Sequence, residues 1–418
     1  MYKCAICGKT INNLFYHERK VWNPRKEMYE AFYTCDSCQI EWNERGNAIN
    51  EYSYKPDPMF INAGDSDLYL GVELEADGGF DPSFAAARIS IPYDEFYIKR
   101  DGSLDTNGIE IVTHPGTLSA HKNNILHWKE VISILKSQHY HSHKTSTCGL
   151  HVHVNRDFFG NTAEEIDLNV SKVILLTQRF WDNCIVPFSR RNLNRLNRWA
   201  KKPTRKFQKG SSGEMITKTH KDTMSRDHYN GVNIMPRNTI EFRMFRGTLN
   251  YNTLIATLEF VYLLCHFAKK ISIDDIDNTK WEDIFEGVDV AEFEALFIYM
   301  ASRKELNKGD NEDVFVQHDA VIRVKTDRSF AVGDRVRIRE WNDMLEEFGY
   351  EAGYHNINCM YIFTSEMNFM CGEAATIMNI VPYGSGSVCY KLDFDDRNIN
   401  DLADCYMISA DMIEHYDN

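Results

Sequence analysis

The pattern of apolar and polar positions divides the chain into three regions. Between about residues 66 and 306, short segments of alternating apolar and polar residues predict strands, and longer periodic segments predict helices. The predicted strands are 68–75, 108–113, 150–154 and 239–245. The predicted helices are 118–136, 163–183, 253–269 and 291–303. This mixture predicts an α+β or α/β domain in which helices pack on a sheet.

The regions on either side have different patterns. Residues 1–55 hold paired cysteines and many aromatic residues, and Lys55-Pro56-Asp57-Pro58 predicts an extended linker after them. Residues 328–418 contain strand-like segments at 330–341, 374–380 and 388–394, separated by Gly and Asp turns. This last pattern resembles a small SH3-like β-barrel.

Charge is distributed unevenly along the chain. The formal net charge is -14, and from Arg328 onward 16 Asp and Glu against 6 Lys and Arg give a net of -10. This acidity makes nucleic acid an improbable partner and leaves a protein partner open for the C-terminal module. By contrast, residues 190–209 contain nine Lys and Arg and no acid, which fits a phosphate-binding lid, a nucleic-acid contact or a solvated helix face.

Composition indicates a globular protein in a reducing compartment. A chain of 418 residues with 43% hydrophobic residues can form two or three domains. We expect no signal peptide, because no apolar run follows a basic start, and no membrane partner, because the most apolar stretch, 254–268, is too short to span a bilayer. The 11 cysteines do not suggest a disulfide framework. We therefore expect a cytoplasmic location.

Two Cys-x-x-Cys pairs near the N-terminus predict a metal site. Cys4 and Cys7 form the first pair, and Cys35 and Cys38 form the second. Each pair can direct two thiolates at one ion, and four thiolates complete a tetrahedral zinc site with no open position for chemistry. We expect a structural Zn²⁺ in a zinc-ribbon-like module.

The predicted strands of the central region share one property, which is a charged face opposite an apolar face. Residues two apart on a strand point to the same side, so Glu73 lies beside Glu75, His151 beside His153, and Glu241 beside Arg243. Glu110 stands between two isoleucines on a fourth strand. The residues on the other face are apolar, namely Val72, Leu74, Val152, Val154, Ile240, Phe242 and Met244.

Such a charged face suits phosphate chemistry. Carboxylates from several strands can bind Mg²⁺, which in turn binds nucleotide phosphates, and arginine can neutralise charge that develops during phosphoryl transfer. A single Glu-x-Glu or His-x-His pair is more often a solvated sheet face or a chance pairing. The functional interpretation therefore depends on the occurrence of four such strands together.

These strands also carry a specific resemblance. The motifs are Leu70-Gly-Val-Glu-Leu-Glu75, Asp101-Gly-Ser-Leu104 with Gly108-Ile-Glu-Ile-Val-Thr-His-Pro115, Cys148-Gly-Leu-His-Val-His-Val-Asn155, and Asn238-Thr-Ile-Glu-Phe-Arg-Met-Phe-Arg-Gly-Thr-Leu-Asn250. In this order, over about residues 66–270, they resemble the amidoligase family. That family belongs to the glutamine synthetase and glutamate–cysteine ligase superfamily and is common in bacteriophage and bacterial genomes.

The resemblance implies a fold and a set of site residues. The fold is α+β, with a glutamine-synthetase-like core at 66–306 whose curved, largely antiparallel sheet is backed by helices. The implied magnesium ligands are Glu73, Glu75, Glu110, His151 and Glu241. The implied nucleotide contacts are Lys99, Asp101, His153 and Arg243. The implied catalytic residues are Arg243, Arg246 and Glu110.

The activity implied by the resemblance is amide-bond formation. A substrate carboxylate would attack the γ-phosphate of ATP with two or more Mg²⁺ ions present, and an amine would then displace phosphate from the acyl phosphate. The substrate would be an amino acid, a peptide or a protein, and the location would be a host cytoplasm if a phage encodes the chain. A catalytically silent, zinc-containing adaptor that binds protein or nucleic acid is the alternative.

One further motif stays open. His139-x-His141-x-His143 has a spacing that could bind a metal, although an exposed polar turn explains it better.

Overall fold

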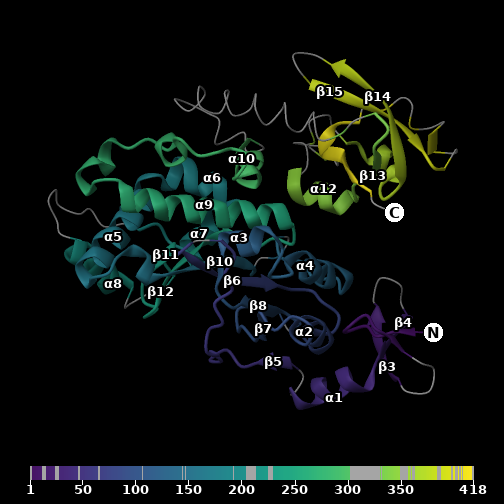
Figure 1. Cartoon of the computed structure of the whole chain (residues 1–418), viewed down its shortest axis with the longest axis horizontal. Helices are drawn as coiled ribbons and strands as arrows, with labels where there is room; N and C mark the ends of the chain where they lie inside the picture. The colour runs from purple at the N-terminus through teal and green to yellow at the C-terminus, as the bar shows by residue number, and fades with distance from the viewer. Residues whose placement is uncertain are drawn as a thin grey trace. The chain divides into compact units, whose positions relative to one another are not determined.

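The computed structural model describes residues 2–301 and 330–416. Within these ranges it leaves out 12–15, 24–27, 46–47, 65, 106, 144, 146, 192, 204–212, 225–228, 331, 349–355, 358, 360–362, 384–386, 397–398, 401–402, 404–405 and 407. The chain divides into two compact units, Met1–Leu296 and Phe297–Asn418 (Figure 1).

A sheet of eight strands forms the centre of the first unit. The strands are β5 (Ile49–Asn50), β6 (Tyr69–Ala76), β7 (Phe96–Lys99), β8 (Ile109–Thr113), β9 (Gly116–Thr117), β10 (Gly149–Asn155), β11 (Val232–Asn233) and β12 (Thr239–Arg246). Their order is β11-β12-β10-β6-β8-β7-β5, with β9 also paired to β6. Only the β5–β7 pair is parallel among these described strands. The prediction of an α+β fold with a largely antiparallel sheet is therefore confirmed, and β6, β8, β10 and β12 are the four predicted strands.

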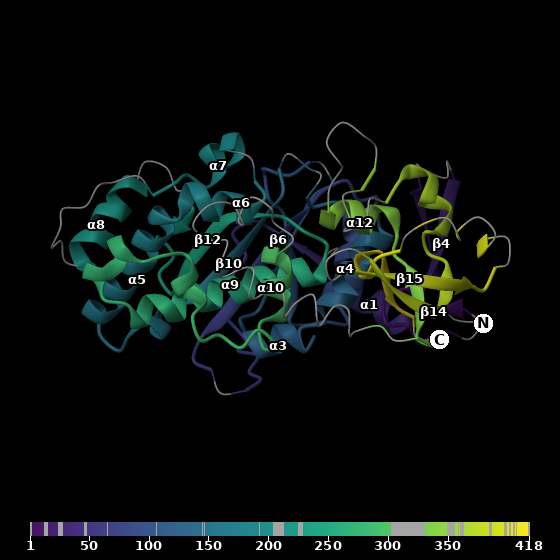
Figure 2. The same cartoon turned by 90° about the horizontal axis from the view of Figure 1, so that it is seen from above.

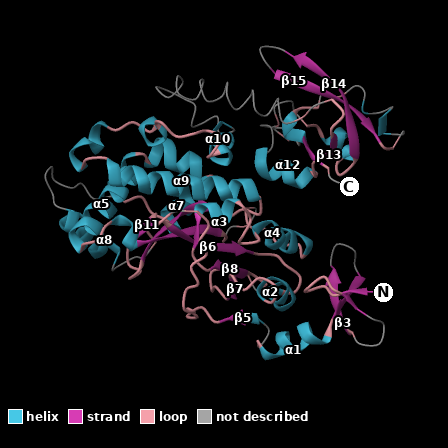
Figure 3. Cartoon of the chain, in the orientation of Figure 1, coloured by secondary structure: helices cyan, strands magenta, loops and turns pink. Residues whose placement is uncertain are grey.

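Helices lie along one side of this sheet, as Figures 2 and 3 show for α9. The α-helices of the unit are α1 (Asp36–Glu44), α2 (Pro82–Ser90), α3 (Leu118–Lys122), α4 (Trp128–Ser137), α5 (Ala163–Arg179), α6 (Val186–Ser189), α7 (Leu193–Trp199), α8 (Gly213–Met224) and α9 (Tyr251–Lys270). A π-helical turn, Trp181–Ile185, joins α5 to α6. The ring of Phe260 on α9 lies 6.2 Å from that of Phe245 on β12, so α9 covers the apolar face of the sheet.

The predicted helices differ from the observed ones in their bounds, and the predicted helix 163–183 ends as α5 at Arg179. The predicted helix 118–136 is two helices, α3 and α4, because Asn124 and His127 between them take left-handed backbone angles. The predicted helix 253–269 begins two residues earlier, where the side chain of Asn250 caps α9 by accepting a bond from Thr253 N at 2.9 Å. The predicted helix 291–303 is observed as α10 (Glu294–Ala301), and residues 302–303 lie outside the described part.

The N-terminal residues form small β-elements followed by α1. The strands are β1 (Tyr2–Lys3), β2 (Thr10–Ile11), β3 (His17–Asn23) and β4 (Met28–Thr34), paired as β1–β2 and β3–β4. These elements contact α2, because Arg19 on β3 forms an ion pair with Asp81 at 2.5 Å and Trp42 on α1 donates to Ser83 Oγ at 3.2 Å. β5 then joins the large sheet beside β7.

The second unit contains a four-stranded antiparallel sheet. Its strands are β13 (Arg335–Ile338), β14 (Ala374–Tyr383), β15 (Ser387–Phe394) and β16 (Ile413–His415), in the order β15-β14-β13-β16. Two of the predicted strands match β14 and β15. The third, 330–341, is shorter, since Trp341 begins the helix α12 (Trp341–Phe348). The SH3-like barrel expected here remains a prediction.

No helix within the described residues has the length and apolar character needed to cross a bilayer.

Candidate active site

The charged face expected from strand periodicity is present on the large sheet. In cross-strand pairs, Glu75 on β6 lies opposite Glu110 on β8, and His151 on β10 lies opposite Glu73 on β6. His153 lies opposite Glu241 on β12. The residues expected on the other face are fully buried, namely Val72, Leu74, Val152, Val154, Ile240, Phe242 and Met244. We call the charged side the front face.

A first cluster on the front face joins three strands. The Nδ1 atom of His151 lies 3.4 Å from Glu73 Oε2 and 3.4 Å from Glu241 Oε1. His153 Nε2 lies 3.5 Å from Glu73 Oε1. Glu73, His151 and Glu241 each offer a ligand atom, and these atoms lie within 4.8 Å of one another. The geometry therefore suits one divalent cation held by two carboxylates and an imidazole.

A second cluster lies beside the first, because Glu73 and Glu75 are two residues apart on β6. It consists of Glu75, Asp101 and Glu110, whose ligand oxygens also lie within 4.8 Å of one another. Lys99 Nζ lies 2.9 Å from Glu110 Oε2 in a buried ion pair. Three carboxylates are a donor set for a hard cation such as Mg²⁺.

The two clusters differ in how their carboxyl groups hold protons. Burial acts to raise the pKa of Glu73, but the charge of His153 and the hydrogen bond with His151 outweigh it and hold the pKa well below its usual range. Burial also acts to raise the pKa of Glu241, but the charges of Arg243 and His153 outweigh it and lower the pKa. In the second cluster, burial and then the charge of Glu73 raise the pKa of Glu110 to about 8. The negative charges around Glu110 are thus not fully balanced by Lys99, as expected for carboxylates arranged to bind a cation.

The two predicted catalytic arginines have different surroundings. Arg243 forms a short ion pair with Glu241, and its buried Nε has no hydrogen-bond partner among the described residues. Arg246 would point to the apolar face by simple alternation, but a register shift in the β10–β12 ladder places it opposite Gly149. Its Nε donates to the carbonyl oxygen of His143 at 2.8 Å. Arg243 is therefore the better placed of the two to contact a phosphate.

The structure adds two residues that the sequence did not single out. Arg191, which follows α6, is buried and donates from Nη1 to the carbonyl oxygen of Arg243 at 3.0 Å. Burial lowers the pKa of this guanidinium, and the charge of Glu75 opposes that change. Asn233 on β11 donates from Nδ2 to Glu241 Oε2 at 2.7 Å. The basic segment 190–209 was the only available signal for Arg191, and nothing in the pattern distinguished Asn233.

Gly71 on β6 and Gly149 on β10 both face the site, but only Gly149 lies too close to its neighbours for a larger residue to fit easily. A Cβ atom at Gly149 would lie 3.0 Å from Arg191 Nη2 and 3.3 Å from Glu75 Oε2. A Cβ atom at Gly71 would meet nothing closer than the Cβ of His153 at 3.6 Å, which is an ordinary contact. The crowded position is thus Gly149, whose N–H also donates to Glu75 Oε2.

The basic segment 190–209 is only partly described. α7 covers residues 193–199, and residues 192 and 204–209 lie outside the described part. Arg195 donates to the carbonyl oxygen of Thr145 at 2.7 Å, and Lys202 forms an ion pair with Asp182 at 2.5 Å. These two cations are engaged within the first unit.

The three histidines of the 139–143 motif do not gather into a metal site within the described chain. The ring of His139 stacks on Phe80, with centroids 4.2 Å apart. The backbone of His141 pairs with that of Asp77. The motif therefore forms a turn, as expected, but none of its three histidines is exposed and His143 is buried.

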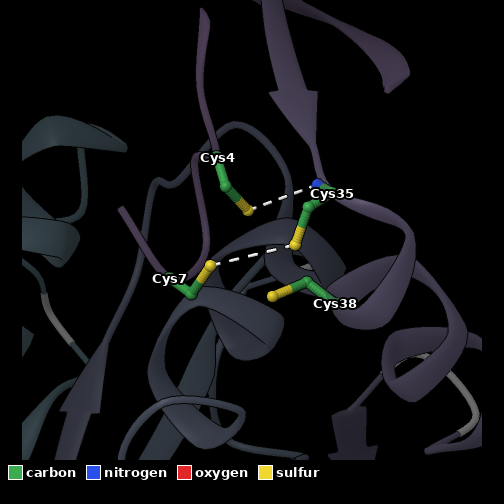
Figure 4. Close-up of side chains that lie close together, drawn as sticks. All are labelled: Cys4, Cys7, Cys35 and Cys38. Carbon is green, nitrogen blue, oxygen red and sulfur yellow. Dashed lines mark hydrogen bonds between the residues drawn. The ribbon is translucent and has the colours of Figure 1, made fainter. Parts of the chain in front are cut away.

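The four N-terminal cysteines form a compact cluster (Figure 4). Cys7 Sγ lies 3.8 Å from Cys35 Sγ, which matches the edge of about 3.8 Å that a tetrahedron with Zn–S bonds of about 2.3 Å would have. The first pair lies in a tight turn, in which Gly8 has a φ of +71° and its N–H donates to the carbonyl oxygen of Cys4 at 2.9 Å. The arrangement fits a structural Zn²⁺ ion, as predicted from the spacing.

Comparisons with known proteins agree with the position of the site. No curated protein matches the chain. The solved structure described as "Apo GmaS without ligand" is similar over 77% of this chain and 85% of its own, with 10% sequence identity and a TM-score of 0.32. The family model described as "Putative amidoligase enzyme" matches residues 66–264, which hold both carboxylate clusters, Lys99 and the three arginines. The central segment of the chain, residues 66–264, is therefore similar to the amidoligase family.

Proposed function

We propose that this protein is an ATP- and magnesium-dependent ligase that joins a carboxylate to an amine through an acyl phosphate. The observation that carries the proposal is the pair of clusters, Glu73–His151–Glu241 and Glu75–Asp101–Glu110, side by side within an amidoligase segment. Two neighbouring cation sites, each with two or more carboxylates, suit a reaction on a polyphosphate, where several negative charges must be neutralised together.

The residues present fit two divalent cations. Glu73, His151 and Glu241 would hold one ion, and Glu75, Asp101 and Glu110 would hold the other. Bound Mg²⁺ would neutralise and orient the phosphates of the nucleotide. Glu75, Glu110 and Glu241 are buried, and Glu73 is partly buried. Buried carboxylates without a cation or other partner would reduce the stability of the fold.

The reaction would consist of two displacements. In the first, an oxygen of the substrate carboxylate forms a bond to the γ-phosphorus of ATP, and the bond from that phosphorus to the β-phosphate oxygen breaks, which releases ADP. In the second, the amine nitrogen attacks the acyl carbon, phosphate leaves and the nitrogen loses a proton. Arg243, with its unpartnered Nε, and Lys99 would stabilise the charge of the transferred phosphoryl group. His153 would contact the phosphates from the β10 side.

The substrates we propose are an amino acid, a peptide or a protein. An adaptor without catalytic activity is the competing function. It provides no physical reason to keep so many ionisable groups buried on one face, because replacing buried ion pairs by apolar residues is often neutral or stabilising.

Substitution of one metal ligand tests the proposal. We expect Glu73→Gln to weaken binding of a Mg²⁺ complex of a non-hydrolysable ATP analogue by about tenfold or more, because the first cluster loses a charged oxygen. Isothermal titration calorimetry measures this affinity, and thermal unfolding shows whether the fold is intact. Glu164→Gln, an exposed position on α5, is the matched control. Equal affinity in wild type and Glu73→Gln would show that the metal assignment is wrong.

A further inference from the structure

Lys99 is held in place by more than its ion pair with Glu110. Only 6% of the residue is exposed. Its Nζ lies 2.9 Å from Glu110 Oε2 and 5.1 Å from the ring centroid of Tyr52. A lysine ammonium at this distance from an aromatic face is attracted by the ring. The Lys99 ammonium therefore interacts with both a carboxylate and an aromatic ring.

Tyr52 reaches this position because β5 joins the large sheet. Asn50 on β5 lies opposite Lys99 on β7, and its carbonyl oxygen accepts a bond from Arg100 N at 2.9 Å. The side chain of Asn50 also donates to the carbonyl oxygen of Ile98 at 3.0 Å. The chain then turns at residues 51–54, which places Tyr52 over the end of Lys99. These residues precede the amidoligase segment 66–264.

Tyr52 has little other structural use in the described part of the chain. It is 65% exposed. Its neighbour Tyr54 is 42% exposed and packs against Tyr97, with ring centroids 5.6 Å apart. The two tyrosines thus share a segment and differ in the group that they contact.

We propose that Tyr52 is a positioning residue that holds the Lys99 ammonium at the edge of the second carboxylate cluster, ready to contact the nucleotide phosphates. This inference rests on the proposed function, since it assigns Lys99 to the nucleotide. A lysine has four rotatable side-chain bonds, and fixing its ammonium before the ligand arrives reduces the entropy lost on binding. The residues before the amidoligase segment would in this way contribute to its site.

A double-mutant cycle tests whether Tyr52 acts through Lys99. We expect Tyr52→Leu to weaken binding of the Mg²⁺ complex of a non-hydrolysable ATP analogue by roughly two- to fivefold, the size of an exposed cation–π contact. Tyr52→Phe keeps the ring and should bind as wild type does. Lys99→Met should weaken binding further, and the double variant Lys99→Met/Tyr52→Leu should bind no more weakly than Lys99→Met alone. Tyr54→Leu is the matched control, with affinity expected to be unchanged.

A second measurement on the same full-length variants needs no nucleotide. The rate at which an amine-acylating reagent labels Lys99, followed by mass spectrometry with exposed Lys55 as internal reference, should rise in Tyr52→Leu. It should stay at the wild-type rate in Tyr52→Phe and Tyr54→Leu.

The outcomes separate the two claims. Additive losses in the cycle, or equal labelling of Lys99 in wild type and Tyr52→Leu, would overturn the role of Tyr52 while leaving the proposed ligase intact. Absence of nucleotide binding in the wild type would overturn the proposed function, and with it the role of Tyr52 in binding. Increased labelling together with a non-additive cycle would support the inference.

Discussion

His121 shows how a single buried residue joins three elements behind the site. It lies on α3, its Nε2 is 3.0 Å from the carbonyl oxygen of Leu70 on β6, and its Nδ1 accepts from Trp128 Nε1 on α4 at 3.0 Å. The indole N–H can only donate, so Nδ1 must be unprotonated and Nε2 must carry the proton. The neutral imidazole is therefore the form that the fold requires.

This requirement predicts a pH dependence of stability. Burial lowers the pKa of His121 from 6.5 to about 4. Between these values the unfolded chain binds a proton that the folded chain does not, so the contribution of His121 is complete above about pH 6.5 and is lost as the pH falls towards 4. The lost contribution is roughly 3 kcal/mol. Chemical denaturation at several pH values gives the free energy of unfolding, and its slope against pH measures this loss.

His121→Gln provides the comparison for that slope. Glutamine can donate and accept but does not titrate, so the slope of unfolding free energy against pH between 4 and 6.5 should be smaller by about one proton than in wild type. Other buried histidines such as His266 contribute in the same direction to both proteins and cancel in the difference. Identical slopes would show that His121 is not neutral in the fold.

Single residues of the site differ in how far the sequence could predict them. Glu73, Glu75, His151 and Glu241 could be placed on one face, because a strand alternates with period two and no other information is needed. Asp101 could be named but not given its place beside Glu75 and Glu110, since it lies in a turn whose path depends on tertiary contacts.

At the scale of elements, the strands β6 and β10 carry the two glycines that test how closely the site is packed. We expect Gly149→Ala to reduce stability by roughly 1–3 kcal/mol, as for other over-packed positions, and to weaken Mg²⁺ binding. The added methyl group would press on Arg191, His151 and Glu75. Unfolding by urea and calorimetric titration with Mg²⁺ measure the two effects.

Gly71→Ala on the adjacent strand is the matched control. The added methyl group there meets only His153 Cβ at 3.6 Å, so both quantities should stay close to those of the wild type. A larger effect at Gly71 than at Gly149 would contradict the packing described for this face.

The β10–β12 ladder shows why element-level prediction has limits. Alternation alone would place Arg246 with Ile240, Phe242 and Met244 on the apolar side. The register shift opposite residues 150–152 reverses that parity and brings Arg246 next to Gly149. A bulge depends on the pairing of two strands and leaves no mark in the periodicity of either one. The break between α3 and α4 similarly arises from two left-handed residues that are not glycine.

At the scale of the whole molecule, the cysteine cluster and the large sheet are parts of one compact unit. Cys35 and Cys38 begin α1, and α1 leads to β5 and then to Tyr52. Arg45, at the end of α1, donates to the carbonyl oxygen of Ser90 on α2 at 2.7 Å. Zinc binding should therefore stabilise β5 as well as its own ligands.

Loss of zinc is predicted to destabilise α1 and β5. We expect about one zinc ion per chain by elemental analysis, and Cys35→Ser should lower the zinc content and the thermal stability. Hydrogen exchange should accelerate in peptides that contain α1, β5 and β7, while peptides from the C-terminal unit keep their wild-type rates. Cys371→Ser, outside the cluster, is the control. A zinc-free wild type would contradict this prediction.

The sequence could predict the order of the regions better than their contacts. The Cys-x-x-Cys spacing and the strand periodicity are local patterns, so the cysteine cluster and the charged sheet face could each be predicted without knowledge of the other. The entry of β5 into the large sheet could not be recognised, because a two-residue edge strand has no periodicity to detect. For the same reason, the contact between Tyr52 and Lys99 followed only from the structure.

The most direct test of the ligase is ADP release from Mg²⁺ and ATP across a matrix of carboxylates and amines, with hydroxylamine as one of the amines. The proposed reaction predicts ADP formation that requires both a carboxylate and an amine, and a hydroxamate product when hydroxylamine intercepts the acyl phosphate. It also predicts loss of this turnover in Glu73→Gln. ADP release that is independent of both substrates, or unchanged turnover in Glu73→Gln, would contradict the account.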